Sequence, residues 1–222
     1  IGTFYGGVNY LSPNTGQFEC FAHSRFSNSV NGTVIGRFCE DTYGHIWIAS
    51  DDGGLSCFSP KDKHFTHYLP DEHRNSLSYH NVHALCMDGD DLWIGTYTGG
   101  VNVLNTKTGV FRVYTTKAGD PTTLDRSSSY AIFKDREARI WVTSMSGVNL
   151  YNREEDNFTR IRDLGSWIMD IDQDADGNIW FSSQGNGLFK YDPDKQEWTN
   201  YVHSSAPGAL INDQVNCVLI DG

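Results

Sequence analysis

The sequence lacks long hydrophobic runs, paired cysteines and an excess of basic residues. None of its 222 residues falls in a stretch of about 18 consecutive apolar residues, so no helix is expected to cross a membrane. The five cysteines are odd in number and widely spaced, without a Cys-x-x-Cys pair. This argues against a disulfide framework or a zinc site and favours buried free thiols. With 17 basic against 28 acidic side chains the net charge is −11, which argues against nucleic acid as the main partner.

Sequence motifs of catalysis and metal binding are also scarce. There is no Gly-x-Ser-x-Gly, no phosphate-binding loop and no His-Glu-x-x-His. Residues 172–177 resemble the first half of a calcium-binding loop, but Ser183 stands at the twelfth position, where such loops need Glu. Two pairs of histidines are three residues apart, so on a strand the two rings of a pair point to opposite faces and cannot easily hold one metal. We therefore expect no cofactor, no metal site and no catalytic residue.

What the sequence does contain is an internal repeat centred on tryptophan. Four similar segments, HIWIAS, DLWIGT, RIWVTS and NIWFSS, surround Trp47, Trp93, Trp141 and Trp180. The opening Ile1–Thr3 matches the residues that follow Trp93, and a virtual tryptophan placed before Ile1 gives repeat lengths of 47, 46, 48 and 39 residues. Repeats of this length are typical of propellers and solenoids. An aspartate precedes each tryptophan by five or six residues, namely Asp41, Asp88, Asp135 and Asp174, and Asp221 repeats the signal at the end.

Each repeat reads as four short antiparallel strands. The segment that ends in the aspartate is followed by a tight turn, the tryptophan strand, a glycine turn, a third strand, a polar turn and a last strand. The tryptophan strands are apolar on consecutive residues, as in Ile46 to Ile48, so both of their faces must be covered. Four-stranded sheets that pack on neighbours on both sides are the blades of a β-propeller. The tryptophans are therefore predicted in the core between sheets, and no helix of consequence is expected.

The predicted fold is all-β: a β-propeller of four-stranded antiparallel blades, with five blades' worth of strands, 20 in all. The N-terminus supplies the second to fourth strands of one blade, and residues 215–220 supply a first strand. The chain is therefore either a closed five-bladed ring or a segment of a larger, seven-bladed propeller. We treat residues 1–222 as one domain. The expected blades are approximately 1–21 with 215–222, then 34–70, 82–116, 129–162 and 167–202.

One rim of such a propeller carries the turns between second and third strands and the connections that enter the first strands. Aligned residues on this rim differ from repeat to repeat while the core positions stay alike, as expected of functional loops on a rigid scaffold; ordinary loop drift is the alternative. Aromatic faces beside polar side chains suit sugars. The candidate ligand-binding residues are Tyr5, Asp51, Asp52, Tyr97, His80, Asn81, His83, Arg126, Tyr130, Trp167, Gln184, Asn212 and Gln214.

Trp167 stands beside the shortest connection on this rim. The count from the last strand to the aligned rim position is 13 residues in three repeats and 14 in a fourth, but only 6 from Ile161 to Trp167. This shortening predicts a notch next to Trp167 where a ligand or a partner could bind, and a neutral deletion is the alternative. The indole itself could instead plug the channel or pack between blades.

The residues from Asp88 to Asn102, and next those from Asp41 to Ser56, best show the pattern Asp-x-x-Gly-x-Ile/Leu-Trp-Ile/Val-Gly-Thr-x-x-Gly-Gly-Leu/Val-Asn. This pattern resembles the two-component regulator propeller repeat, found in periplasmic sensor regions of hybrid two-component histidine kinases of Bacteroidetes. The turn after Asp88 is one residue short. Other departures are Ala138 in place of the turn glycine, and Ala-Ser, Thr-Ser or Ser-Ser in place of Gly-Thr in three repeats.

The resemblance implies a fragment of a periplasmic sensor region that is not catalytic itself, recognises oligosaccharides and signals to a histidine kinase in the rest of the chain. It also implies a homodimer of the intact receptor, with contact to nucleic acid or to the membrane only through parts outside this sequence. Two other functions stay open. One is an enzyme like the streptogramin lyases, which would use His80 or His83 and an acid with a divalent ion; the other is a structural or protein-interaction propeller.

Overall fold

The computed structural model describes residues 1–11, 15–24 and 28–221, and all regular secondary structure in these ranges is β. The prediction of an all-β chain is therefore confirmed. None of the described residues forms a helix that is long and apolar enough to span a membrane. The chain divides into two compact units, residues 1–113 and residues 114–222, and each is described by itself.

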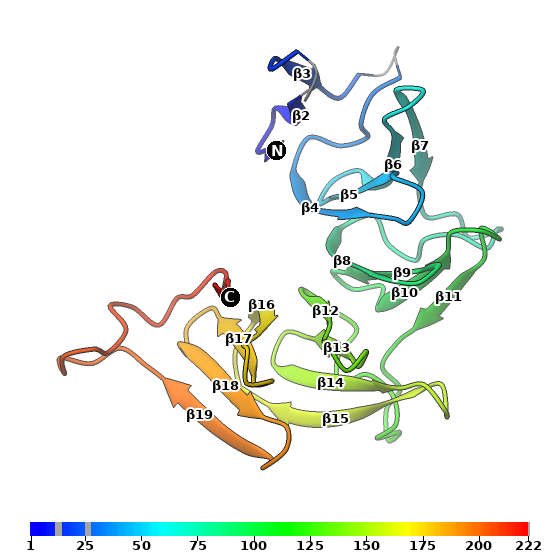
Figure 1. The fold of residues 1–222 in the computed structure, drawn as a ribbon. Coiled ribbons are helices and arrows are strands. Elements are labelled where there is room, and N and C mark those ends of the chain that lie inside the picture. The colour runs from blue at the N-terminus through cyan, green and yellow to red at the C-terminus, as the bar shows by residue number, and fades with distance from the viewer. Residues whose placement is uncertain (12–14, 25–27, 222) are drawn as a thin grey trace. The chain divides into compact units, whose positions relative to one another are not determined.

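The first unit contains a three-stranded sheet and two four-stranded sheets, each antiparallel with its strands in chain order (Figure 1). The first sheet consists of β1 (Gly2–Thr3), β2 (Gly7–Leu11) and β3 (Phe18–Phe21). The second consists of β4 (Ile35–Glu40), β5 (Ile46–Ser50), β6 (Gly54–Ser59) and β7 (His64–Tyr68). The third consists of β8 (Val82–Asp88), β9 (Asp91–Thr96), β10 (Val101–Asn105) and β11 (Phe111–Tyr114).

The second unit contains two four-stranded antiparallel sheets with the same strand order. One consists of β12 (Ile132–Lys134), β13 (Ile140–Thr143), β14 (Gly147–Asn152) and β15 (Asn157–Asp163). The other consists of β16 (Ile168–Gln173), β17 (Ile179–Ser183), β18 (Leu188–Asp192) and β19 (Glu197–Tyr201). The predicted repeat of four antiparallel strands is thereby confirmed in four sheets of the chain.

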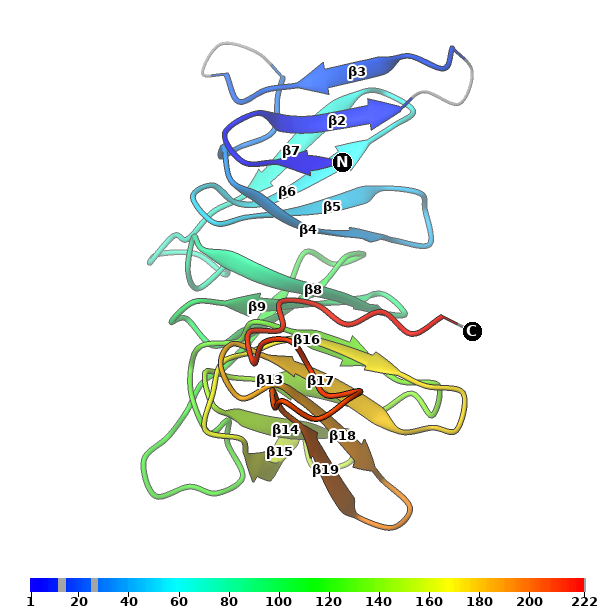
Figure 2. The ribbon, with the colours of Figure 1, turned by 90° about the vertical axis from the view of Figure 1, so that its left-hand side faces the viewer.

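The twentieth expected strand, residues 215–220, has no strand assignment. The segment runs beside β16, where the backbone N–H groups of Val218 and Ile220 donate to Asp170 Oδ2 at 3.3 Å and to Asp172 Oδ2 at 2.7 Å (Figure 2). A strand needs a neighbouring backbone to complete its ladder of hydrogen bonds. At its first residue, the Val215 N–H donates to the Ser183 carbonyl at 2.8 Å, and further along side-chain carboxylates are the partners instead of a strand.

The aspartate that precedes each tryptophan binds the indole of that tryptophan in three of the sheets. Asp41 Oδ2 accepts a hydrogen bond from Trp47 Nε1 at 3.0 Å, and the backbone N–H of His45 donates to Asp41 Oδ1 at 3.0 Å. The equivalent indole bonds join Trp141 to Asp135 at 2.7 Å and Trp180 to Asp174 at 2.8 Å. Burial acts to raise the pKa of Asp41, but the hydrogen bonds from His45, Trp47 and Tyr43 outweigh it and hold the pKa below its usual value. The six-residue spacing thus lets one carboxylate close the turn and satisfy a buried indole.

The indoles of Trp47 and Trp141 pack against the next sheet in the chain. Trp47 lies in an apolar cluster with Val82 and Phe111 of the third sheet, and Trp141 meets the ring of Phe181 edge-on with centroids 6.1 Å apart. Trp47 is 3% exposed and Trp141 1%. Covering roughly 200 Å² of an indole contributes on the order of 5 kcal/mol before opposing terms. The predicted core position is confirmed for these tryptophans.

The core prediction is wrong for Trp180, which is only half-buried. The indole of Trp180 stacks on Tyr201 of its own sheet at 5.5 Å, and the Lys190 ammonium lies 5.5 Å from the centre of the indole. The reason is that each indole needs the following sheet to cover it. Among the described residues, no further sheet follows β16–β19.

The cysteines are free thiols, but their expected burial is wrong. Cys20 and Cys217 are exposed, and Cys39, Cys57 and Cys86 are partly buried. Cys20 lies on β3, the outer strand of its sheet, and Cys217 lies in the segment without strand pairing, so no sheet packs over either thiol. Burial raises the pKa of the Cys57 thiol to about 12 and also raises the pKa of Cys39.

The connections between sheets clamp the outer strand of the sheet that follows. In the connection before β8, the Asn75 side chain donates to the Phe111 carbonyl at 2.8 Å and accepts from the Phe111 N–H at 2.6 Å. Asn28 accepts from the Phe65 N–H of β7 at 2.7 Å, which repeats the arrangement one sheet earlier. The connection of residues 164–167 is shorter, and no equivalent bond reaches β19 from the part of the chain that the structure describes.

Candidate functional site

The candidate rim residues lie in the turns between second and third strands and at the entry to the first strands. At that entry the pairing of β4, β8 and β16 with the tryptophan strand is interrupted by an irregularity of the β-bulge type. A bulge bends its strand and changes the direction of the extra side chain. The extra residue is His83 in β8 and Met169 in β16. A position that varies between the repeats is therefore also one where the fold departs from regular pairing.

Four of the candidates, Asp51, Asn81, His83 and Tyr97, lie together in the first unit, and we call them the His83 cluster. The Asn81 side-chain amide donates to Asp51 Oδ1 at 2.9 Å and also to the Asp51 carbonyl. His83 Nε2 is 3.5 Å from Asp51 Oδ1, and the Tyr97 ring meets the imidazole edge-on with centroids 6.0 Å apart. The Tyr97 N–H donates to the Asn81 carbonyl at 3.1 Å, which joins the turn after β9 to the entry of β8.

The His83 imidazole is disposed to be neutral. Burial lowers the pKa of His83, and the Asp51 carboxylate opposes this effect without outweighing it. The Asp51 side chain is 47% exposed and that of His83 22%, but His83 Nε2 itself is buried, so a ligand can reach the carboxylate and only the exposed part of the imidazole. A neutral imidazole beside a carboxylate can hydrogen-bond a ligand or act as a general base.

Asp52 follows the cluster in sequence but serves its own loop. Its carboxylate accepts hydrogen bonds from Thr33 Oγ1 at 2.6 Å, from the Thr33 N–H at 2.8 Å and from Ser50 Oγ at 2.7 Å. Burial acts to raise the pKa of Asp52, but these bonds outweigh it and hold the pKa well below its usual range. Its oxygens are thus already used by the fold.

His80 and Tyr5 are exposed, and neither belongs to the His83 cluster. The His80 ring stacks on Tyr79 with centroids 4.7 Å apart. Tyr5 is 75% exposed, has a φ of 65° and lies edge-on against Phe4 at 4.5 Å. A left-handed φ is uncommon for a tyrosine, so the turn after β1 holds this ring in an exposed position.

In the second unit, Tyr130 and Trp167 stack with ring centroids 5.3 Å apart and planes inclined by 24°. Tyr130 is 7% exposed whereas Trp167 is 37% exposed, so the tyrosine supports the indole from the buried side. The Gln184 N–H donates to the Trp167 carbonyl at 2.9 Å, and Ser166 Oγ donates to the Gln184 carbonyl at 2.9 Å. These four residues bring together three elements of the rim, and we call them the Trp167 platform.

Asn212 and Gln214 lie in the same unit, at a cavity of about 430 Å³. The cavity is lined by Gly185, His203, Ile211, Asn212, Asp213 and Gln214. The Gln214 N–H donates to Asn212 Oδ1 at 2.8 Å, and Gln214 forms an isolated β-bridge with Gln184 of the Trp167 platform. The two predicted residues are thus tied to the platform through the backbone.

Arg126 lines a separate cavity of about 380 Å³ in the second unit, which we call the arginine pocket. Its lining residues are Asp125, Arg126, Val148, Arg160, Arg162 and Asp163. The sequence singled out Arg126 but gave no reason to place it with Arg160 and Arg162, which are more than 30 residues further along the chain. The connection before β12, the start of β14 and the end of β15 together form this pocket.

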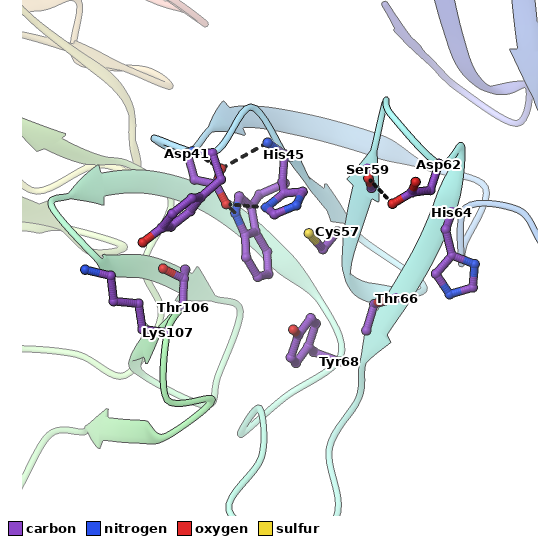
Figure 3. A pocket seen from close by; sticks show the side chains of 12 residues that line it. Asp41, His45, Cys57, Ser59, Asp62, His64, Thr66, Tyr68, Thr106 and Lys107 are labelled. Carbon is purple, nitrogen blue, oxygen red and sulfur yellow. Dashed lines mark hydrogen bonds and ion pairs between the residues drawn. The ribbon is translucent and has the colours of Figure 1, made fainter.

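Sequence reasoning missed a groove of about 470 Å³ at the end of the first unit where the aspartate turns lie (Figure 3). Its lining residues include Tyr43, His45, Tyr68 and Lys107, and Figure 3 shows Tyr68 and Lys107 on two different sheets. A cavity of similar size lies at the equivalent place in the second unit, around Tyr151. Because the groove recurs beside the turn that follows the aspartate, we attribute its shape to the repeated fold. The signal that could have revealed the groove in the sequence is the aspartate turn, because this turn contains several of the lining residues.

Within residues 1–11, 15–24 and 28–221, no group of three or more His, Cys, Asp and Glu side chains is arranged to hold a metal ion. In the turn that resembles a calcium loop, the Asp174 carboxylate accepts hydrogen bonds from the Asn178 side chain at 2.9 Å and from the Trp180 indole at 2.8 Å. This aspartate has the same structural role as its counterparts in the other repeats.

The match to a known family covers part of one repeat. Residues 76–98 match the two component regulator propeller family. This segment includes the Ser76–Ser78 connection and the Trp93 strand, on which part of the predicted resemblance rested. No curated protein matches the chain.

Solved structures share the fold. The extracellular domain of BT4673 from B. thetaiotaomicron, described as a hybrid two component system, aligns with a TM-score of 0.80 and 16% identity over 99% of this chain and 28% of that one. The extracellular domain of BT3049 from the same organism, also described as a hybrid two component system, aligns with a TM-score of 0.57 and 20% identity over 96% of this chain and 34% of that one. This chain thus spans about a third or less of those domains.

An enzyme also shares the fold. A catalytically inactive variant of virginiamycin B lyase from Staphylococcus aureus, in a structure with quinupristin, aligns with a TM-score of 0.57 and 19% identity over 80% of this chain and 56% of that one. At these identities the structural matches establish the fold alone. The β-propeller fold is therefore confirmed, and the similarity to the two component regulator propeller family rests on residues 76–98.

Proposed function

We propose that the chain is a non-catalytic, ligand-sensing segment of the extracytoplasmic region of a hybrid two-component system, and that its rim binds oligosaccharides. The regulator propeller repeat and the fold shared with two extracellular domains support the sensor role. The proposal includes a periplasmic location, a histidine kinase elsewhere in the intact protein and a homodimeric receptor.

The Trp167 platform carries the proposal of an oligosaccharide ligand. A sugar ring has an apolar C–H face and a rim of hydroxyl groups, so it pairs with an exposed aromatic face that has polar groups beside it. Trp167 offers such a face, backed by Tyr130, and the Ser166 hydroxyl and the Gln184 backbone are held beside this residue by hydrogen bonds. Covering about 100 Å² of apolar surface on binding contributes roughly 2.5 kcal/mol at about 25 cal/mol per Å².

Calorimetric titration of the chain with a panel of plant and host oligosaccharides tests this proposal. We expect at least one to bind, and Trp167→Ala to weaken its binding by about tenfold to a hundredfold, since the apolar contact is lost. Tyr43→Ala is the matched control, because Tyr43 is an exposed aromatic residue of the groove in Figure 3. Absence of binding across the panel, or an equal loss in both variants, would contradict the proposal.

A second candidate function, an enzyme like the lyases, is favoured by two observations. His83 Nε2 lies 3.5 Å from Asp51 Oδ1, and a lyase shares the fold. Incubation of the chain with quinupristin and Mg²⁺, followed by mass spectrometry, distinguishes the two functions. The sensor proposal predicts no conversion. Conversion that is lost in His83→Ala would replace it with the enzymatic function.

A further inference from the structure

The arginine pocket is a positively charged site in a chain whose net charge is −11. It contains Arg126, Arg160 and Arg162 against Asp125 and Asp163, so its charges sum to +1. All three arginines are exposed, and none of them forms an ion pair with a carboxylate of the described residues. A cavity with a net positive charge favours the binding of an anion.

Both aspartates of the pocket are engaged in holding the loops around it. Asp125 Oδ1 accepts from the Asn149 side chain and Asp125 Oδ2 from Ser144 Oγ, both at 2.7 Å. Asp163 Oδ1 accepts from the Gly165 N–H at 2.8 Å, at the start of the short connection. These carboxylates therefore stabilise the rim turn and the connection and do not pair with the arginines.

Two of the arginines are oriented by neutral groups, and the Asp120 carboxylate also interacts electrostatically with Arg160. Arg160 Nε donates to the Thr123 carbonyl at 2.9 Å and Arg160 Nη2 donates to the Leu124 carbonyl at 3.1 Å. The guanidinium carbon of Arg162 lies 5.3 Å from the centre of the Trp198 ring. Carbonyl bonds and cation–π stacking fix the direction of a guanidinium group and keep its remaining N–H donors available.

The pocket lies at the shortened connection that the sequence reveals. Asp163 is the last residue of β15, and Trp167 follows only four residues later. In the first unit, the connection before β8 is long enough to run back along the outer strand β11 through Asn75. The connection of residues 164–167 has no residues to spare for such a course along β19, the outer strand of the sheet that follows it. Arg160 and Arg162 lie on β15, the strand directly before this connection, and both are exposed.

We infer that the arginine pocket binds the carboxylate or sulfate group of an acidic oligosaccharide, an inference that rests on the proposed function. A planar guanidinium group presents parallel N–H donors that match the paired oxygens of a carboxylate or a sulfate. Three such groups around one cavity favour an anionic ligand over a neutral one, and the Trp167 platform lies a few residues along the chain from the pocket.

The test is calorimetric titration of the chain with matched pairs of oligosaccharides. The probes are tetragalacturonate and its neutral methyl ester, a sulfated galactan oligosaccharide and its desulfated form, and inorganic sulfate alone. The variants are Arg126→Gln and Arg162→Gln. Arg112→Gln is the control, because Arg112 is an arginine of the other unit that already pairs with Asp91 at 2.8 Å. Arg126 has no hydrogen bond or ion pair with the described residues, so its replacement should leave the fold intact.

We expect an acidic probe to bind about tenfold to a hundredfold more tightly than its neutral form, and each pocket variant to lose a similar factor, because hydrogen bonds to charged groups are lost. Arg112→Gln should bind like the unchanged chain. Equal binding of acidic and neutral forms, unaffected by the pocket variants, would overturn this inference and leave the proposed function standing. Binding of inorganic sulfate alone, lost in Arg162→Gln, would refute the saccharide and retain a small-anion site. Binding of no probe at millimolar concentration would overturn the inference, and the wider panel above would then decide the proposed function.

Discussion

Replacing Asp135 by alanine should destabilise the chain more than any exposed turn substitution. The Asp135 side chain is 0% exposed and accepts hydrogen bonds from the Trp141 indole at 2.7 Å, from the Arg139 N–H at 2.8 Å and from Arg139 Nε at 2.5 Å. A buried polar group left without a partner costs about 1–3 kcal/mol, and a hydrogen bond to a charged group contributes about 1.5–3 kcal/mol. Water can replace the acceptor at Arg139, whose side chain is 32% exposed, but not at the indole. We therefore expect the free energy of unfolding to fall by about 2–4 kcal/mol.

Urea unfolding followed by circular dichroism measures this loss. Asp176→Ala is the matched control, because Asp176 is an exposed residue of the equivalent turn whose carboxylate bonds to no described residue, and it should change the free energy by less than about 0.5 kcal/mol. A double-mutant cycle with Trp141→Phe isolates the indole bond and should give a coupling of about 1 kcal/mol or more. If Asp135→Ala is no more destabilising than Asp176→Ala, the assignment of the aspartate as partner of the indole is refuted.

Three further predictions concern packing, pH and thiol reactivity. Gly53→Ala should cost about 1–3 kcal/mol of stability, since a Cβ there would lie 2.4 Å from a backbone carbonyl oxygen, whereas Gly36→Ala meets nothing within 4 Å; equal effects in urea would contradict this. The pKa of His83 in the folded chain lies below the ordinary histidine value of 6.5. As the pH falls, the imidazole of the unfolded chain is therefore protonated before that of the folded chain. Stability should therefore decrease as the pH falls below about 6.5, and His83→Gln should remove that share of the slope; an unchanged slope would count against it. At pH 8, Cys20 should react with Ellman's reagent much faster than Cys57, whose pKa is about 12, and mass spectrometry showing the opposite order would refute the assigned burial.

The repeating part of the fold was predictable because its causes lie close together in sequence. The bond from Trp47 to Asp41 joins residues six apart, and a hairpin turn is formed by the residues between them. A local pattern of this kind repeats whenever the same contact repeats. The alternation of turns and apolar strands could therefore be assigned from the sequence alone, down to strand ends within a few residues.

Features that depend on a neighbouring sheet were not predictable in the same way. Trp180 has the same sequence context as Trp47 and yet is half-buried, because burial of an indole is decided by the sheet that follows. Residues 215–220 have the composition of a first strand, but pairing needs a tryptophan strand beside it. The exposure of Cys20 likewise follows from its place on an outer strand, which no local pattern specifies.

The candidate site was predictable in its location and only partly in its chemistry. Alignment of the repeats placed Asp51, Asn81 and His83 on one rim, but the contact between Asn81 and Asp51 joins residues 30 apart and is visible only in the structure. The stacking of Tyr130 on Trp167 likewise joins two connections 37 residues apart. The sequence did reveal the shortened connection at Trp167, whereas the arginine pocket joins residues more than 30 apart and is visible only in the structure.

Fluorine NMR of the tryptophans tests most directly whether the rim binds a saccharide. The chain has six tryptophans; Trp167 is 37% exposed, whereas Trp47, which lines the groove of Figure 3, is 3% exposed. With 5-fluorotryptophan in the chain and resonances assigned by single Trp→Phe variants, an oligosaccharide that binds in calorimetry is titrated. Binding on the Trp167 platform predicts that the Trp167 resonance shifts with the calorimetric affinity while that of Trp47 stays in place. A shift of the Trp47 resonance alone, or no shift at Trp167 at saturation, would contradict it.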